Sequence, residues 1–396
     1  RHSCSFDELR KRVPSIGGQN LKGGFFLKDA VTDDARLVLR VLKEAINEGA
    51  SALNYCKVTS LVKNNHQVDG VEFENSETGM KHKVSGRIVI NATGAWADRL
   101  RSQITKKNNE AIRPLRGSHI ILPAERLPLI DNVSIIHPND KRPVIALKWE
   151  GRILMGTTDI DHQANLDQEA AISNQEVDYL LEALNFQFPN YNFTRNDIIS
   201  TQAGIRPVVN TGKKNPSQES RDHVIWEEEG LLTVTGGKMT TFRVIAQDAL
   251  KKAQSIIGTI PDLDAKKPIF SKSIDSSDYP NHKVTPEIIQ RLIGRYGEDA
   301  RQLIEKEPGS QKHEVVDGTE TLWSELPYVS NEMIVHLDDL MLRRTRLGLL
   351  QPQGGKSLMP KIKSIVQPLL NWDDEKWSRE ESRYLKIWND FYSVPE

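Results

Sequence analysis

The chain has 396 residues, of which 38% are hydrophobic and 27% charged, and its formal net charge is -1. This length exceeds one ordinary core and predicts two or three domains. The near-zero net charge gives no broad electrostatic reason to expect a nucleic-acid partner.

Cys4 and Cys56 are far apart and show no C-x-x-C spacing, which argues against a disulfide scaffold or a zinc ribbon and fits a reducing compartment. No apolar run approaches the ~20 residues of a membrane-spanning helix. No signal peptide is visible either, so any membrane contact is expected to be peripheral. The chain opens with Arg1 and not with methionine, which predicts a fragment of a longer protein.

The first third of the chain predicts part of a nucleotide-binding domain. Residues 1–32 are expected to be loop-rich. A helix is expected from the Asp33-Asp34 pair to Gly49, with an apolar stripe between. Strands are expected at 51–55, 58–62, 68–73, 82–85 and 87–91. The last strand enters the turn Ala92-Thr93-Gly94, an order typical of the back half of a doubly wound domain.

Beyond residue 111 the pattern changes twice. Strands at 118–122, 144–147 and 152–157, with a helix at 174–184, predict a mostly antiparallel domain. A buried strand at 231–235, two glycines and a helix at 239–253 return to the nucleotide-binding domain. Apolar periodicity at 285–307, 331–347 and 373–391 predicts a third, all-α domain.

The segment LLTVTGGKMTTFR (231–243) carries the first chemical motif. Gly236 and Gly237 let the backbone approach a ligand, and the exposed N–H groups of the helix start favour negative charge. A reduced flavin develops anionic character, so a helix N-terminus aimed at it would stabilise that form. The competing interpretation is an ordinary strand–turn–helix with a solvated Lys238. A second turn, at Gly94 in IVINATGAWAD (88–98), could also lie near a cofactor but is common in α/β proteins.

Cationic and imidazole groups are scattered through the middle of the chain: His119 in RGSHI, Arg206 in AGIRP, Arg221 in SRDH, and Lys238. Arginine presents a planar fork of donors that matches phosphate oxygens. A histidine has a pKa suited to accepting an alcohol proton as hydride leaves the same carbon. Taken singly, each residue is better explained as part of a surface ion pair or as a satisfied core histidine than as a site residue.

Three other patterns are set aside. Gly354-Gly355-Lys356-Ser357 resembles a P-loop, but the first glycine of that motif would fall on Leu350. The basic cluster around Arg343 could touch anionic lipid, but Asp339 four residues earlier favours a salt-bridged helix face. No metal-ligand spacing occurs, so no metal site is predicted.

Taken together and in order, the motifs resemble the flavin-dependent glycerol-3-phosphate dehydrogenases of the bacterial aerobic type. The resemblance runs from about residue 24 to residue 348. The matching segments are TDDARLVL (32–39), IVINATGAW (88–96), RGSHI (116–120), GTTD (156–159), AGIRP (203–207), SRDH (220–223), TGGKMTTFR (235–243) and LDDLMLRRTRLG (337–348).

This resemblance implies an α/β fold with an incomplete FAD/NAD(P)-binding doubly wound domain, an antiparallel substrate domain and an all-α C-terminal domain. The remaining part of the FAD-binding domain is expected at 30–110 and 229–260. The substrate-binding antiparallel domain is expected at 1–29 and 111–228, and the helical domain at 275–396.

The resemblance also implies a reaction, in which sn-glycerol 3-phosphate is oxidised to dihydroxyacetone phosphate by hydride transfer to FAD, and a quinone takes the electrons. Arg206 and Lys238 would bind the substrate near the flavin and take part in catalysis. Arg221 would support the phosphate or substrate charge. His119 would be the proton acceptor and contact the substrate. The expected FAD contacts are Val58, Gly94, Gly237, Met239 and Thr240.

The expected location is cytoplasmic, peripheral on the inner face of the cell membrane, and a homodimer is left open. The G-x-G-x-x-G fingerprint of the family is absent, and residues 1–30 hold no substitute. The family's N-terminal region is therefore expected to lie outside this chain, which alone would hold FAD weakly or not at all. Leu147-Lys148 replaces a pair that is Ile-Pro in many relatives, which puts the local loop geometry in doubt.

Other functions stay open. One is the oxidase version of the enzyme, with O2 as acceptor. A second is a non-catalytic fragment that lacks the FAD pyrophosphate site. A third is another amine- or hydroxyacid-oxidising flavoenzyme, whose substrate would lack phosphate.

Overall fold

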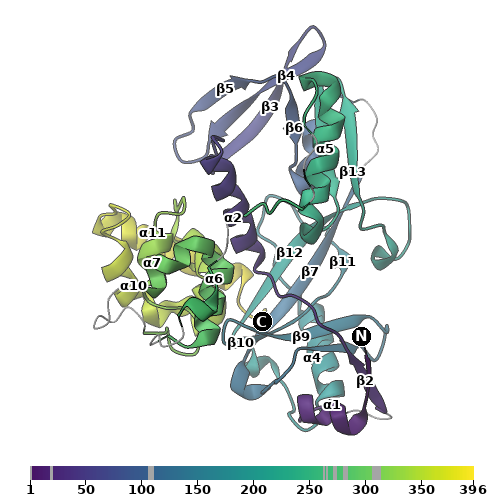
Figure 1. The fold of residues 1–396 in the computed structure, drawn as a ribbon, viewed down its shortest axis with the longest axis vertical. Coiled ribbons are helices and arrows are strands. Elements are labelled where there is room, and N and C mark those ends of the chain that lie inside the picture. Colours follow the sequence, from purple (N-terminus) through teal and green to yellow (C-terminus); the bar gives the residue numbers. More distant parts are fainter. Residues whose placement is uncertain are drawn as a thin grey trace.

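The computed structural model describes residues 2–17, 21–105, 111–261, 264, 266–270, 274–279, 284–305 and 314–396. Two small sheets with two helices form the upper part in Figure 1, a larger antiparallel sheet forms the lower part, and the C-terminal helices lie to one side. Within the described residues, no helix has the length and apolar character needed to cross a bilayer.

The upper part contains a short parallel strand pair, as expected for a doubly wound domain. β6 (Val89–Asn91) runs parallel to β14 (Leu231–Gly236), and β13 (His223–Glu228) pairs antiparallel with β14 on its other edge. Helix α5 (Phe242–Ile257) packs on this sheet through a small core of Leu232, Val234, Ala249 and Ala253. The predicted α/β fold class is confirmed by this arrangement.

A three-stranded antiparallel meander follows helix α2 (Asp34–Asn47). It consists of β3 (Cys56–Asn64), β4 (Gln67–Asn75) and β5 (Lys81–Ser85). The strand predicted at 51–55 is wrong. Tyr55 has a φ of 54°, which interrupts an extended chain. Its hydroxyl donates to Asp339 at 3.0 Å, and Asn54 donates to the Met333 carbonyl at 2.8 Å, so side chains hold this segment against the C-terminal helices.

The lower sheet is antiparallel throughout. Its strands are β7 (Ile112–Pro123), β8 (Val133–Ile136), β9 (Pro143–Trp149), β10 (Arg152–Gly156), β11 (Ile160–Asp161) and β12 (Ser200–Val209). The order is β11-β7-β10-β9-β8, with β12 also paired to β7. β7 and β12 are the long strands that reach from this sheet into the upper part (Figure 1). Helix α4 (Asn174–Gln187) begins at a Ser173–Glu176 capping box and buries Leu180 and Leu184 in the core of this part.

The N-terminal segment is more regular than expected. β1 (His2–Ser5) and β2 (Gly23–Phe26) form an antiparallel pair, and α1 (Phe6–Arg12) lies between them in the chain. Val13 and Ile16 are buried in the same core as Leu180. The expectation of a loop-rich segment is therefore wrong for these elements, because a Ser5–Glu8 capping box starts a helix that the sequence pattern alone did not reveal.

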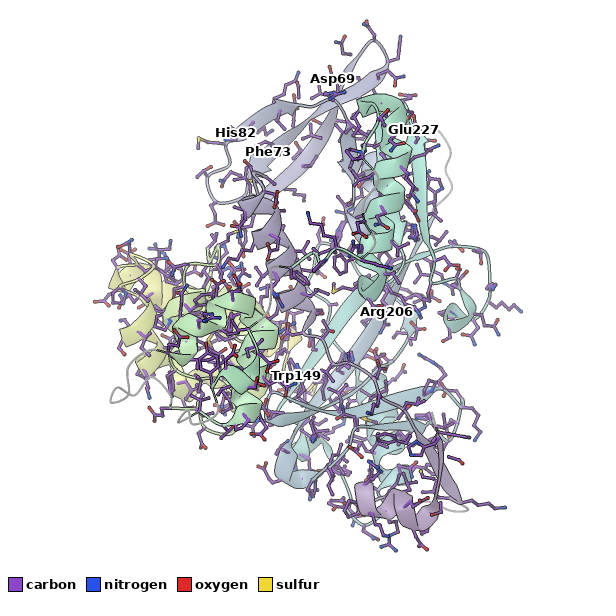
Figure 2. The ribbon with its side chains drawn as sticks, in the orientation of Figure 1. Asp69, Phe73, His82, Trp149, Arg206 and Glu227 are labelled. Carbon is purple, nitrogen blue, oxygen red and sulfur yellow. The ribbon has the colours of Figure 1, made fainter. Side chains whose placement is uncertain are left out.

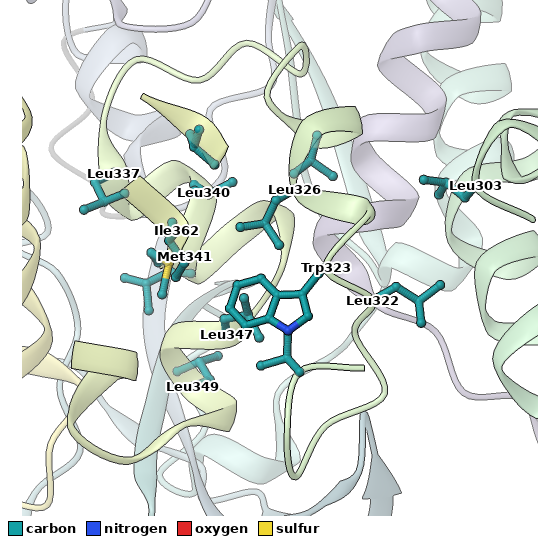
Figure 3. Close-up of a cluster of buried hydrophobic side chains, with 14 of the residues drawn as sticks. Leu303, Leu322, Trp323, Leu326, Leu337, Leu340, Met341, Leu347, Leu349 and Ile362 are labelled. Carbon is teal, nitrogen blue, oxygen red and sulfur yellow. The ribbon is translucent and has the colours of Figure 1, made fainter. Parts of the chain in front are cut away.

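The C-terminal part is helical and has its own core, which Figure 3 shows around Trp323 and Met341. Its helices are α6 (Pro286–Tyr296), α7 (Ala300–Ile304), α8 (Glu325–Val329), α9 (Leu347–Leu350), α10 (Met359–Val366) and α11 (Asp374–Phe391). The predicted helix at 373–391 is confirmed as α11.

Two predicted C-terminal helices are not continuous. The one at 285–307 is broken at Gly297, whose φ is 62°, and its last two residues lie outside the described residues. The one at 331–347 is mostly irregular and contains one π-helical turn, Asp339–Arg344. Met333 and Arg346 have φ values of 54° and 66°, which no helix accommodates.

The C-terminal helices are attached to α2 by buried ion pairs. Asp33 caps α2 by accepting from the Arg36 backbone N–H at 3.0 Å. The same carboxylate lies 3.0 Å from Arg295 and 3.3 Å from Arg346. Burial opposes ionisation of Asp33, yet Arg346 and Arg295 lower its pKa well below the ordinary value. Asp33 therefore stays charged and joins the start of α2 to the helical domain.

Candidate functional site

A cleft of about 810 Å³ lies where the three parts meet. β7 and β12 form its floor, the bend after β14 forms a second wall, and the start of α2 with the C-terminal part forms a third. Figure 2 shows Arg206 on the long strands between the upper and lower parts, and Trp149 beside the C-terminal helices. The predicted site residues that line this cleft are His119, Arg206, Arg221, Gly237, Lys238 and Met239.

His119 projects from β7, next to Gln202 of β12 and Gly156 of β10. A Cβ placed on Gly156 would lie 2.2 Å from His119 Cδ2, so only glycine leaves room for this imidazole. Burial and the nearby Arg206 lower the pKa of His119 to about 4. At neutral pH the ring is therefore uncharged and can accept a proton. In the part of the chain that the structure describes, neither ring nitrogen has a hydrogen-bond partner.

Arg206 projects from β12 over the backbone of Gly117 on β7. A Cβ on Gly117 would lie 2.1 Å from Arg206 Nη2, so the absence of a side chain at this position leaves the space that the guanidinium occupies. Arg206 donates to Thr157 Oγ1 at 3.0 Å and to Asp159 Oδ1 at 3.3 Å. Burial lowers the pKa of Arg206, but an arginine stays protonated under such a shift.

Arg221 lies on the segment between β12 and β13 and shares a carboxylate with Arg206. Its Nη2 donates to Asp159 Oδ2 at 2.8 Å, and Ser217 Oγ donates to the same oxygen at 3.2 Å. Arg142 lies 3.7 Å from this oxygen. Asp159 itself is buried, with 3% of its side chain exposed.

Asp159 was not among the predicted site residues, although its motif GTTD (156–159) was identified. The available signal was its position in the sequence. Asp159 comes shortly after the predicted strand at 152–157, and its motif belongs to the same ordered set as the motifs of Arg206 and Arg221. Trp149, Asp33 and Arg346 also line the cleft and were given no place in the predicted site.

Lys238 and Met239 follow the glycine bend at the end of β14. Gly236 and Gly237 have φ values of 75° and 76°, and a Cβ on Gly237 would lie 2.7 Å from Ile245 Cδ1. The predicted helix at 239–253 begins later than expected, because a short 3-10 turn precedes α5. The bend therefore presents Lys238 and Met239 to solvent at the cleft.

Three of the predicted FAD contacts do not line this cleft. Gly94 lies beside β14, where its carbonyl accepts from Thr235 Oγ1 at 3.4 Å. Val58 is on β3, opposite Phe73 of β4, in the upper meander. Thr240 is exposed at the start of the turn before α5. A cofactor that touched all of them would extend from the cleft along the upper part.

Among the described residues, no group of three or more His, Cys, Asp or Glu side chains could hold a metal ion. The predicted pairing of Asp339 with Arg343 is also different in the structure. Arg343 pairs with Asp338 at 2.9 Å and lies 3.6 Å from Glu169.

Comparison with known proteins places two family models on the chain. The model described as FAD dependent oxidoreductase matches residues 3–247, and the model described as the C-terminal domain of alpha-glycerophosphate oxidase matches residues 236–377. The aerobic glycerol-3-phosphate dehydrogenase of Staphylococcus aureus strain USA300 is 31% identical over 364 residues, covering 85% of this chain and 64% of that protein. The same protein of strain MRSA252 has the same identity and coverage. This chain therefore spans somewhat less than two thirds of the length of these relatives.

A solved structure supports the same fold. The glycerol-3-phosphate dehydrogenase from Bacillus halodurans, complexed with FAD, superimposes with a TM-score of 0.80 at 24% sequence identity. The match covers 98% of this chain and 79% of that one.

Proposed function

The chain belongs to the FAD dependent oxidoreductase family, and on that premise we propose that it carries the substrate site of an enzyme that oxidises sn-glycerol 3-phosphate to dihydroxyacetone phosphate. The aligned relatives that are named glycerol-3-phosphate dehydrogenases support this substrate. The remainder of the proposal rests on the cleft.

The observation that carries the proposal is the convergence of Arg206, Arg221, Lys238 and His119 on one cleft. These residues come from four separate segments of the chain, and the positive groups suit a phosphate monoester, which carries up to two negative charges. Arginine forks offer paired donors to phosphate oxygens. Arg206 and Arg221 are proposed to bind the phosphate, and Lys238 to add positive charge near the reacting carbon.

His119 is proposed as the proton acceptor. Its lowered pKa keeps the imidazole neutral at physiological pH, and its ring nitrogens are not engaged by other described residues. A neutral imidazole beside the C2 hydroxyl could take the hydroxyl proton while hydride leaves the same carbon. Arg206 disfavours a second positive charge on His119, so the histidine is a weak but available base.

FAD, the cofactor of the family, would supply the hydride acceptor. The residues present fit its flavin end: the glycine bend places Gly237, Lys238 and Met239 in the cleft lining, and the positive φ of Gly237 with its close approach to Ile245 favours glycine there. Gly94 lies beside the same strand end and is a proposed backbone contact, with Thr240 and Val58 proposed further along the cofactor. The pyrophosphate end has no matching fingerprint in this sequence.

A quinone is proposed as the final electron acceptor, with peripheral contact to the inner face of the cell membrane. The oxidase alternative transfers electrons to O2 instead. The measurement is turnover with a quinone analogue compared with oxygen consumption, in the flavin-loaded enzyme that contains this chain. Fast oxygen consumption would decide for the oxidase.

The central test is Arg206→Ala in that enzyme. We expect the KM for glycerol 3-phosphate to rise or kcat to fall by about 10-fold or more, since a charge-assisted hydrogen bond contributes about 1.5–3 kcal/mol. The matched control is Arg12→Ala, which removes an arginine from an exposed pair with Asp131 outside the cleft. An unchanged KM and kcat for Arg206→Ala would favour a related flavoenzyme whose substrate lacks phosphate.

A further inference from the structure

We infer that Asp159 is a positioning residue for substrate recognition: it fixes Arg206 and Arg221 at the spacing that receives one phosphate group. The inference rests on the proposed function, because it concerns the same cleft. It explains why a buried, negatively charged carboxylate lies beside a site that is proposed to bind an anion.

The geometry shows a carboxylate shared between two guanidinium groups. Asp159 Oδ1 accepts from Arg206 at 3.3 Å, and Oδ2 accepts from Arg221 at 2.8 Å. The two arginines come from different segments, β12 and the connection that follows it. A single fixed acceptor between them therefore sets the distance between their forks.

The arginines keep donors for a ligand. Asp159 and its neighbours engage only the two Nη atoms of Arg206, and Arg221 uses only Nη2 among the contacts of the described residues. Both side chains line the cleft and remain about one third exposed, at 29% and 34%. Asp159 is itself held from the other side by Ser217, so its own position is constrained.

The charges support the same role. Arg206 and Arg221 line the cleft and share the single negative charge of Asp159, so the pair remains net positive towards a phosphate monoester; the third arginine near Asp159, Arg142, lies outside the cleft lining. A carboxylate near an anion site weakens binding through simple Coulomb repulsion. It strengthens binding only if it organises the arginines. Removing the charge of Asp159 should therefore strengthen anion binding if repulsion dominates, and weaken it if the positioning of the arginines dominates.

The experiment is titration calorimetry of the 396-residue chain with glycerol 3-phosphate, with glycerol as the ligand that lacks phosphate. For Asp159→Asn we expect about 10-fold weaker binding of glycerol 3-phosphate, on the scale of one charge-assisted hydrogen bond. Asp159→Glu, which keeps the carboxylate, should recover part of the affinity. Asp178→Asn is the matched control, because it removes a carboxylate from an exposed pair with Arg195 outside the cleft.

Equal or tighter binding by Asp159→Asn would overturn the inference and leave the proposed function intact, since Coulomb repulsion would then be the whole effect. Failure of the unaltered chain to bind glycerol 3-phosphate better than glycerol would overturn the inference, while the kinetics of Arg206→Ala in the flavin-loaded enzyme decide the proposed function separately. The thermal unfolding midpoint is measured for each variant. If Asp159→Asn does not fold, Ser217→Ala tests the inference instead. Ser217 is exposed, and its removal takes away one hydrogen bond that holds Asp159, so binding of glycerol 3-phosphate should weaken about 2- to 3-fold. Unchanged binding by Ser217→Ala would then reject the inference.

Discussion

Gly117 and Gly204 are direct cross-strand partners on β7 and β12, but a side chain would meet resistance at only one of them. A Cβ on Gly117 would fall within 2.1–2.4 Å of the Arg206 guanidinium, whereas a Cβ on Gly204 would have nothing within 4 Å. An alanine at Gly117 should therefore displace the Arg206 side chain, and an alanine at Gly204 serves as the matched control.

Gly117→Ala should displace Arg206 and weaken binding of glycerol 3-phosphate by about 10-fold. The cost in unfolding free energy should stay below about 1 kcal/mol, because the displaced group is the end of a flexible side chain. Gly204→Ala should preserve the fold equally well and change binding less. Calorimetry and thermal unfolding of both variants test this, and equal affinities for the two would remove Gly117 from the argument.

The His119 imidazole should titrate near pH 4 in the folded chain, about where its lowered pKa lies. Because the folded pKa is lower than the unfolded value near 6.5, the neutral ring stabilises the fold fully above pH 6.5, and this contribution declines as the pH falls towards 4. The measurement is the NMR titration of the His119 ring resonance, assigned with His119→Gln. A midpoint near 6.5 would contradict both the burial argument and the effect of Arg206.

Asp33→Asn should destabilise the chain by about 3–5 kcal/mol, because Arg295 and Arg346 lose a buried partner. The control is Asp34→Asn at the neighbouring position. Asp34 also contacts Arg346, but its side chain is 64% exposed, so the loss should stay below about 1 kcal/mol. Since the pKa of Asp33 is lowered in the fold, its contribution is present above about pH 4 and is lost on further acidification. Denaturant unfolding at pH 7 distinguishes the variants, and similar losses at both positions would refute the special role of Asp33.

The 396-residue chain should bind FAD weakly or not at all, because no glycine-rich fingerprint offers N–H donors to the pyrophosphate. The folded chain also leaves apolar side chains uncovered beside the expected cofactor position: Ile90 of β6 is 45% exposed and Met239 is 45% exposed. Quenching of flavin fluorescence measures the affinity. A yellow preparation with one FAD for each chain would prove this prediction wrong.

Much of the fold could be predicted because local patterns and long-range contacts agree. The apolar stripe of α2 and the strand–glycine–helix order at β14 are local, and both are found where expected. The segment 331–347 misled because Leu337, Leu340, Met341 and Leu347 are all buried. A segment that is buried on all sides carries apolar residues at helical spacing even when it is not a helix. The left-handed backbone conformation of Arg346 has no signal in the amino-acid composition.

The site was predictable in its residues but not in its contacts. His119 and Arg206 belong to recognisable motifs, but their proximity depends on the register of β7 with β12, which pairs residues 79 to 97 positions apart. Asp159 was overlooked because an acidic side chain contradicts a simple charge argument for an anion site. Its role becomes visible only once Arg206 and Arg221, from different segments, are found on its two oxygens.

The ion pairs at Asp33 make the helical tail part of the electrostatics of the cleft. Arg346 and Arg295 belong to that tail, while Asp33 and Asp34 belong to the cleft wall. A chain shortened before residue 285 would keep the two aspartates and lose the arginines that neutralise them. The shortened cleft would then attract an anion less strongly than the intact one, even with Arg206 and Arg221 still in place.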